Sequence, residues 1–330
     1  NLIKNIYPNL LSVASMMDIT DLHFKNLIRL ISKNIFLYTE MINVNTIIND
    51  QNKRFLIEGD CKGPVALQIG CSDPILAKQA ANIFAKENFQ EININCGCPS
   101  SKVVNGNFGA CLMKEPIKVG KMIDAIKEET DIPITVKTRI GLDNFDTDEF
   151  LEEFISELHS KNVKTVIIHA RIAILKGLSP HENRTIPPLN YERVKYIKNT
   201  FKDMKIILNG GIKNLKEAKW HLNTFDGSMI GRAAWDNPWM LSETDNLFYN
   251  YKNNMSRSEI IGKYLKYASK YISLGHSQRR LVRPLFNLFY GVQGTKIWKQ
   301  QLNEVANNKI SINSIYDLSS QLEETIEEAA

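Results

Sequence analysis

The chain has 330 residues, of which 43% are hydrophobic and 23% are charged, an ordinary balance for a globular protein. No run approaches the roughly 18 apolar residues that a membrane span requires, so we expect no span. The length predicts one domain of about 250 residues and a smaller one. The first residues, with Lys4 and Pro8, lack a signal-peptide pattern, and five cysteines are an odd number for a disulfide framework. We therefore expect a cytoplasmic protein.

The net charge of +5 is unevenly distributed. Residues 251–300 contain ten Lys or Arg residues and one acid, Glu259. This excess favours a polyanionic partner, although a solvated helical face would have the same composition.

Eight apolar, β-branched runs of strand length recur along the chain. They cover residues 10–15, 35–39, 65–69, 91–95, 134–137, 165–169, 205–209 and 227–230. Strands without strong alternation of apolar and polar residues indicate a parallel sheet that is buried on both faces. Eight such units predict a closed (β/α)8 TIM barrel. An open doubly wound sheet is the alternative, but no GxGxxG follows the first run.

Helical patterns separate these runs. Residues 148–160 place apolar side chains on one face, a second helix is expected to begin with Ser72 as N-cap and Pro74 in its first turn, and a third follows Asn214. From about residue 243 the pattern becomes helical, including residues 279–291. We therefore predict a barrel domain over residues 1–242 and a helical domain over residues 243–330.

The ends of the predicted strands are polar, and in a TIM barrel the chemistry is built at the carboxyl ends of the strands. Asn209-Gly210-Gly211 and Gly231-Arg232 are suited to hold a phosphate through backbone N–H groups. Lys137 and Gln68 would suit the electron-rich pyrimidine edge of a flavin. His169 could serve the same ring or the substrate.

Three cysteines lie in residues 93–113, and four interpretations compete for them. A CxC spacing without a second pair is a poor zinc site, and it is not the usual spacing of a redox pair. A structural turn around Gly97 and Pro99 needs no chemistry. A general acid is the fourth, because a thiol with an unperturbed pKa near 8.5 is mostly protonated at neutral pH.

Several segments together resemble the tRNA-dihydrouridine synthases, and most of all their bacterial A subfamily, which acts on uridines 20 and 20a of the D loop. The similarity covers essentially the whole chain. The segments are residues 38–41, 66–70, 93–100, 105–113, 136–141, 169–189, 208–212 and 230–238.

The resemblance implies an FMN-containing barrel followed by a helical domain that binds tRNA. NADPH would reduce the flavin, hydride would pass from flavin N5 to uracil C6, and Cys98 would protonate C5. No metal, membrane or stable protein partner is expected, and we expect a monomer. The implied FMN contacts are Ser15, Met16, Met17, Gln68, Lys137, His169, Asn209, Gly210, Gly211, Gly231 and Arg232. The implied tRNA contacts are Asn95, His181, Arg184, Lys296 and Lys299.

Four positions depart from the family pattern. Ser15 stands where Pro is usual, His181 replaces a usual Lys, and Lys296 and Lys299 stand where Arg is common. Lys keeps the charge but loses the planar fork of Arg. Two other functions remain open: a flavoenzyme that acts on a free pyrimidine, and an RNA-binding protein without catalysis.

Overall fold

The computed structural model describes residues 10–50 and 63–328, and these form two compact units. The first contains the described residues of 10–17, 36–50 and 64–231; the second contains residues 18–35, 63 and 232–328. Lys4, Pro8 and Cys61 lie outside the described residues. The predicted assignment of functions to residues 1–242 and 243–330 stays a prediction.

The first unit is a closed parallel barrel, which confirms the predicted (β/α)8 fold. The strand order is β2-β1-β9-β8-β7-β6-β5-β4, and a pairing of β2 with β4 closes the ring. These strands are β1 (Leu11–Val13), β2 (Phe36–Tyr38), β4 (Val65–Gly70), β5 (Glu91–Cys96), β6 (Ile134–Arg139), β7 (Thr165–His169), β8 (Lys205–Asn209) and β9 (Gly227–Ile230). A short strand that the sequence did not predict, β3 (Ile42–Asn43), pairs with β4.

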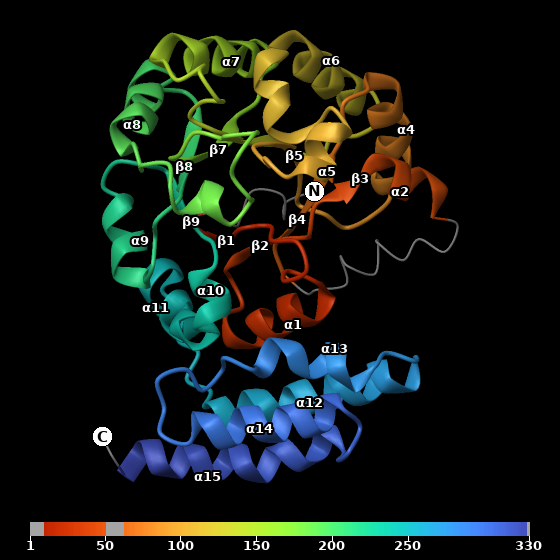
Figure 1. Cartoon of the computed structure of the whole chain (residues 1–330), viewed down its shortest axis with the longest axis vertical. Helices are drawn as coiled ribbons and strands as arrows, with labels where there is room; N and C mark the ends of the chain where they lie inside the picture. The colour runs from red at the N-terminus through yellow and green to blue at the C-terminus, as the bar shows by residue number, and fades with distance from the viewer. Residues whose placement is uncertain (1–9, 51–62, 329–330) are drawn as a thin grey trace. The chain divides into compact units, whose positions relative to one another are not determined.

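Helices follow the strands and lie outside them (Figure 1). They are α2 (Val44–Asn49), α4 (Pro74–Phe84), α5 (Ser101–Asn105), α6 (Pro116–Lys127), α7 (Asp148–Ser160), α8 (Tyr191–Thr200) and α9 (Leu215–His221), with 3-10 turns at η2 (Gly109–Lys114) and η3 (Glu182–Arg184). Their apolar faces are buried, as at Leu151, Phe154 and Leu158 of α7.

The helix termini agree with the sequence at Asn214 but not at Ser72. Asn214 caps α9 by accepting a hydrogen bond from the Glu217 N–H at 2.8 Å. The expectation that Ser72 caps α4 was wrong. Asp73 is the N-cap, and its carboxylate accepts hydrogen bonds from the N–H groups of Ile75 and Leu76. A cap must directly precede the first helical residue, here Pro74, and Ser72 lies one residue too early.

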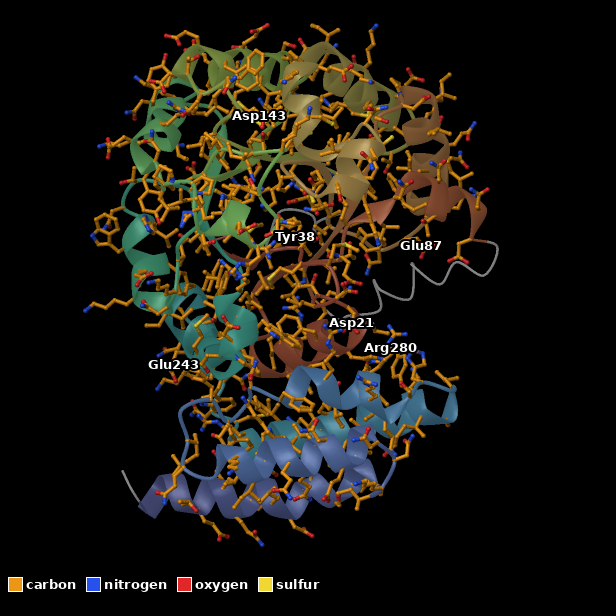
Figure 2. All side chains as sticks on the ribbon, in the orientation of Figure 1. Asp21, Tyr38, Glu87, Asp143, Glu243 and Arg280 are labelled. Carbon is orange, nitrogen blue, oxygen red and sulfur yellow. The ribbon has the colours of Figure 1, made fainter. Side chains whose placement is uncertain are left out.

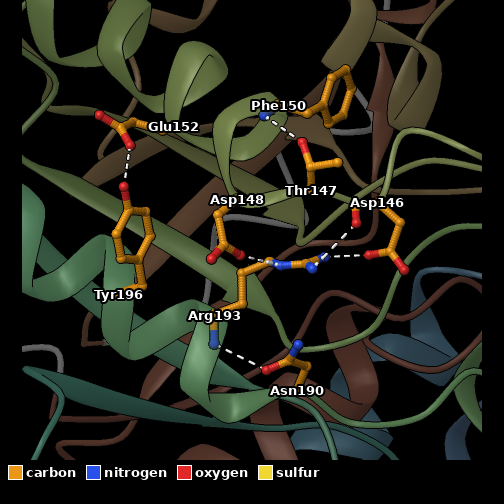
Figure 3. Close-up of polar contacts among 8 residues, drawn as sticks. All are labelled: Asp146, Thr147, Asp148, Phe150, Glu152, Asn190, Arg193 and Tyr196. Carbon is orange, nitrogen blue, oxygen red and sulfur yellow. Dashed lines mark hydrogen bonds and ion pairs between the residues drawn. The ribbon is translucent and has the colours of Figure 1, made fainter.

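Helices α7 and α8 are joined by polar contacts at the barrel surface (Figure 3). The Arg193 guanidinium donates to Asp148 at 2.7 Å and also pairs with Asp146. Tyr196 on the next turn donates to Glu152. Because these groups are exposed or only partly buried, we assign them to the local packing of the two helices.

The barrel interior has an apolar side. Its members are Ala14, Phe36, Tyr38, Ala66, Ile167, Ile207 and Met229, all buried in one cluster. In TIM barrels, inward-pointing side chains of alternate strands fill the interior in this way. The barrel is therefore a packed core and not a pore.

The second unit is helical. It contains α1 (Leu22–Ile31), α10 (Ala233–Asp236), α11 (Thr244–Tyr249), α12 (Arg257–Ser273), α13 (Gln278–Val282), α14 (Thr295–Ala306) and α15 (Ile315–Glu328), with 3-10 turns at η4 (Pro238–Glu243), η5 (Arg283–Leu285) and η6 (Ile312–Ser314). The helical pattern expected over residues 279–291 yields a short helix and a 3-10 turn, because Pro284 lacks an N–H and cannot continue an α-helix. Across the described residues, no helix has the length and apolarity of a membrane span.

A buried carboxylate connects α1 to α11 within the second unit. Asp245 is fully buried and accepts hydrogen bonds from the Ser32 hydroxyl at 2.7 Å and from the backbone N–H groups of Lys33 at 2.7 Å and Asn34 at 3.0 Å. We call this the Asp245 network. Its donors belong to the segment after α1, so the carboxylate fixes the end of that helix.

Candidate active site

The polar side of the barrel interior comes from three adjacent strands. Asn93 on β5 lies between Gln68 on β4 and Thr135 on β6 in the strand register. The Gln68 amide Nε2 donates to Asn93 Oδ1 at 2.8 Å, and Asn93 Nδ2 donates to Thr135 Oγ1 at 2.8 Å. All three side chains are buried, so these bonds lie in a medium where an unpaired polar group would be costly.

The same hydrogen bonds extend in both directions. At one end Thr135 Oγ1 donates to Glu91 Oε1 at 2.5 Å, and the Tyr38 hydroxyl donates to the same oxygen at 2.8 Å; Tyr38 is labelled in Figure 2. At the other end Asn95 Nδ2 donates to Gln68 Oε1 at 2.9 Å. We call the path from Tyr38 and Glu91 through Thr135, Asn93 and Gln68 to Asn95 the amide chain.

Glu91 begins β5 and is buried. Desolvation raises the pKa of its carboxyl to about 7, and the hydrogen bonds from Thr135 and Tyr38 oppose this shift. The carboxyl therefore changes its protonation near neutral pH while it remains an acceptor for two hydroxyl groups.

Asn95 joins the amide chain to the loop that carries Cys98. Its Oδ1 accepts hydrogen bonds from the backbone N–H groups of Gly97 at 3.1 Å and Cys98 at 2.9 Å. The Ala110 N–H donates to the Cys98 carbonyl at 3.0 Å. The backbone of Cys98 is thus held from both sides, while its side chain stays partly exposed.

The other two cysteines of this stretch are placed differently. Cys96 is fully buried, and desolvation raises the pKa of its thiol. The Cys111 thiol donates to the Phe108 carbonyl at 3.1 Å, and burial also raises its pKa. Both positions disfavour a thiolate, which is consistent with packing roles.

Positive charge gathers beside Cys98. Burial, and then Arg139, lower the pKa of the Lys137 ammonium to about 7, although a Cys98 thiolate would act in the opposite direction. Burial also lowers the pKa of the His169 imidazole well below its usual value, and Arg139, Lys137, Arg171 and Arg184 act in the same direction. His169 is therefore neutral, in a field that favours a negatively charged ligand.

Two polar groups in this region have capacity left for a ligand. The Nδ1 atom of His169 is buried and has no hydrogen-bond partner among the described residues. The Lys137 side chain forms no hydrogen bond or ion pair within residues 10–50 and 63–328. Since buried polar groups are normally paired, His169 is a candidate to contact a ligand. The partly exposed Lys137 is a second candidate.

Arg139 is a site residue that the sequence did not single out. Its side chain is buried; Nε donates to the Gly97 carbonyl at 3.0 Å, and Nη1 donates to the carbonyls of Ile172 at 3.0 Å and Asn183 at 2.9 Å. It therefore ties the Cys98 loop to the loop after β7. A signal existed, since Arg139 lies two residues after Lys137 and points to the same face of β6.

The loop after β7 is organised by Asn183. This residue is fully buried, and its side chain accepts from the Ile174 N–H at 2.7 Å and donates to the Ile174 carbonyl at 2.8 Å. The flanking residues His181 and Arg184 are exposed. The anchor holds the backbone of the loop and keeps these two side chains at the surface.

The predicted phosphate-binding residues follow β8 and β9. Gly210 and Gly211 have φ values of 109° and 78°, which side-chain-bearing residues rarely adopt. A Cβ on Gly211 would lie 2.5 Å from Leu189 and 2.6 Å from the Tyr191 hydroxyl. A Cβ on Gly231 would meet no atom of the described residues within 4 Å, so these residues leave space beside its backbone. Asn209 donates to the Met229 carbonyl at 2.8 Å and joins the two strands.

The barrel topology brings most of the predicted residues to one end. Five of them lie in the second half of their strands: Gln68, Asn95, Lys137, His169 and Asn209. The segments that follow the strands contain Ser15 to Met17, Cys98, Gly210, Gly211 and Gly231. Arg232, Lys296 and Lys299 belong to the second unit, the two lysines on α14.

Comparison with known proteins gives concordant results. The family model described as dihydrouridine synthase matches residues 12–327. The tRNA-dihydrouridine(20/20a) synthase of Shewanella oneidensis is 42% identical over 297 residues, which are 90% of this chain and 88% of that protein. The protein of the same name from Escherichia coli K12 is 42% identical over 298 residues, 90% of this chain and 86% of that protein.

Two solved structures share the fold. Morphinone reductase superposes with a TM-score of 0.52 at 12% identity, over 77% of this chain and 89% of that chain. A 2-naphthoyl-CoA reductase superposes with a TM-score of 0.56 at 10% identity over 73% of this chain, which spans about half, 52%, of that enzyme. At such identities the likeness shows the fold alone.

Proposed function

The chain belongs to the dihydrouridine synthase family, and from this premise we propose that it reduces the C5–C6 double bond of uridines 20 and 20a in tRNA to 5,6-dihydrouridine. The observation that carries the proposal is the set of groups beside Cys98. A partly exposed thiol lies on a loop anchored by Asn95 and beside the basic side chains of Lys137 and Arg139. This arrangement suits the protonation of a carbon whose neighbouring carbonyl becomes negatively charged.

FMN is the proposed cofactor and NADPH the proposed reductant. When bound, the flavin would supply hydride to C6 of the base. The His169 Nδ1 atom and the Lys137 side chain have no hydrogen-bond partner in the part of the chain that the structure describes, and both fit the polar edge of its ring system. Gln68 would contact the same edge, the backbone of Ser15, Met16 and Met17 would lie against the ring, and the glycine segments with Asn209 and Arg232 would hold the phosphate.

Cys98 is the proposed proton donor to C5. Hydride addition at C6 leaves negative charge on the C4 oxygen of the base, and C5 then requires a proton on the opposite face. Asn95 would donate a hydrogen bond to that oxygen, and the positive field of Lys137 and Arg139 would stabilise its charge.

Residues of both units are proposed to bind tRNA. His181 and Arg184 are exposed on the loop after β7, and Arg184 can hold a base edge by a bidentate contact. In the second unit Lys296 is exposed on α14 and Lys299 is partly exposed. Lysines at these positions suit contacts with phosphates, which position a tRNA without reading its sequence.

The direct test uses purified protein, FMN, NADPH and an unmodified tRNA transcript. Nucleoside mass spectrometry should detect a mass gain of two hydrogens at positions 20 and 20a. A transcript with cytidine at both positions is the control. Wild-type protein that binds FMN and tRNA but forms no dihydrouridine would contradict the proposal.

Two other functions give different results in the same assay. An enzyme that acts on a free pyrimidine would oxidise its reduced flavin with uracil or dihydroorotate present and tRNA absent. A tRNA-binding protein without catalysis would retain the transcript on a filter and purify without a flavin spectrum.

A further inference from the structure

The amide chain has a fixed hydrogen-bond direction. Asn95 Oδ1 faces two backbone N–H groups, those of Gly97 and Cys98, so it can only accept. The Nδ2 group must then donate to Gln68 Oε1. An amide oxygen has two lone pairs and an amide nitrogen has two hydrogens. Within residues 10–50 and 63–328, Asn95 therefore retains one unused N–H and no unused lone pair.

The opposite end of the amide chain requires the same direction. Glu91 Oε1 accepts from the hydroxyls of Tyr38 and Thr135. Once the Thr135 proton points to Glu91, its oxygen must accept from Asn93 Nδ2. Asn93 Oδ1 then accepts from Gln68 Nε2, which leaves Gln68 Oε1 for Asn95.

We propose that Glu91, acting through Thr135, Asn93 and Gln68, is a positioning residue that holds Asn95 as a pure hydrogen-bond donor toward the carbonyl oxygen of the target base. The proposal rests on the proposed function for the identity of the base. It assigns a role in the reaction to Glu91, Thr135 and Asn93, three buried residues for which no contact with the flavin or the base is proposed.

The consequence for the reaction follows from geometry. If the Asn95 amide rotated, its Nδ2 would face two N–H groups, and its oxygen would face the base carbonyl. The contact would be lost at the atom where negative charge develops. Since a preorganised donor acts mainly in the transition state, an error here should lower the limiting rate more than the apparent affinity for tRNA.

Thr135 offers matched variants. Thr135→Val keeps the shape of the side chain but removes the hydroxyl that accepts from Asn93 and donates to Glu91. Thr135→Ser keeps that hydroxyl. Thr138→Val is the control, since Thr138 is also buried on β6 but bonds only the carbonyls of Cys96 and Arg139, each at 3.4 Å.

The experiment measures single-turnover dihydrouridine formation against tRNA concentration in the FMN-loaded enzyme. Thr135→Val should lower the limiting rate about tenfold or more, with the half-saturating tRNA concentration within about twofold of wild type. Thr135→Ser and Thr138→Val should retain the wild-type rate. A Thr135→Val enzyme with the wild-type limiting rate would overturn the proposal, as would a Thr135→Ser enzyme that is equally impaired.

A second measurement does not depend on activity. In the wild type the N–H groups of Gly97 and Cys98 are bonded to Asn95, so hydrogen exchange of a peptide covering residues 95–100 should be several-fold faster in Thr135→Val and unchanged in Thr138→Val. Equal exchange in all variants would overturn the amide chain itself. If the wild type is inactive but the variants show the expected exchange pattern, the proposed function is wrong and the amide chain is still supported. If Thr135→Val fails to fold, Thr135→Cys, which weakens the same hydrogen bonds, takes its place in both measurements.

Discussion

The two units of the molecule each contain a buried polar network, and the networks differ in how they end. The Asp245 network in the second unit is closed, because every donor that it gathers terminates on one carboxylate. The amide chain in the barrel is open, because it ends at Asn95, which keeps one amide N–H without a partner among the described residues. Closed networks stabilise a fold, whereas an open end marks a place where a ligand completes the bonding.

The largest effect on activity should come from Cys98→Ala, in the loop that the open amide chain holds through Asn95. Loss of a general acid typically lowers a rate by a factor of 10² to 10⁴, so we expect dihydrouridine formation to fall roughly a thousandfold. FMN absorbance and the melting temperature should stay at wild-type values. Cys111→Ala is the control in the same assay, and full activity of Cys98→Ala would remove this thiol from the reaction.

In the closed Asp245 network, Asp245→Asn should reduce the stability of the fold without changing the rate of the reaction. The substitution places an amide N–H against the donors of Ser32 or Lys33, so we expect the free energy of unfolding to fall by about 3 kcal/mol. Denaturant titration gives that value, and activity per folded molecule should match the wild type. The exposed Glu324→Gln should shift stability by less than about 0.5 kcal/mol.

Glu91→Gln should separate stability from function within the barrel. The folded-state pKa of Glu91 is raised from 4.5 to about 7, so the folded protein binds more protons than the unfolded chain between these values. Its contribution to the free energy of unfolding is present below pH 4.5 and is lost as the pH rises through about 7. Relative to the wild type, Glu91→Gln should gain about 3 kcal/mol from pH 4.5 to pH 8.

The amide oxygen of that variant can still accept from Thr135 and Tyr38, so its activity should persist. The measurements are denaturant unfolding curves of the wild type and of Glu91→Gln at pH 4.5 and pH 8, together with the rate of dihydrouridine formation by both proteins. A pH-independent difference between the two proteins would show that Glu91 keeps an ordinary pKa.

The smallest expected effect concerns Arg139, which connects the Cys98 loop to the loop after β7. Arg139→Lys keeps the positive charge but cannot reach the carbonyls of Gly97, Ile172 and Asn183 together. We expect the limiting rate to fall about tenfold, with a smaller change in FMN affinity. Rapid-mixing kinetics and flavin titration measure the two quantities, and an unchanged rate would restrict Arg139 to packing.

Much of the barrel could be predicted from sequence because its eight strands are short apolar runs at regular intervals. The amide chain inside the barrel could not be predicted from the sequence. Glu91, Asn93 and Asn95 alternate with Ile92 and Ile94, which marks one polar face of β5, but alternation does not reveal the partners of that face. Those partners depend on a register that only the closed sheet defines.

The predicted site residues share one end of the barrel because strand ends are visible in the sequence. Arg139 was missed because its hydrogen bonds to backbone carbonyls of two loops leave no motif. Its spacing from Lys137 indicates only the face of β6 on which it lies. The inclusion of α1 in the helical unit was equally invisible, since its apolar face fits a surface of the barrel as well as another helix.

The division of the second unit into distant segments constrains how the protein can fold during synthesis. Ser32 meets Asp245 across 213 positions, and His23 meets Tyr267 across 244. At translation rates of about 5–20 residues per second, α1 would wait roughly ten to fifty seconds for these partners to emerge. During that interval its apolar face has no final neighbour, so nascent chains should depend on chaperones more than a barrel built from consecutive units would.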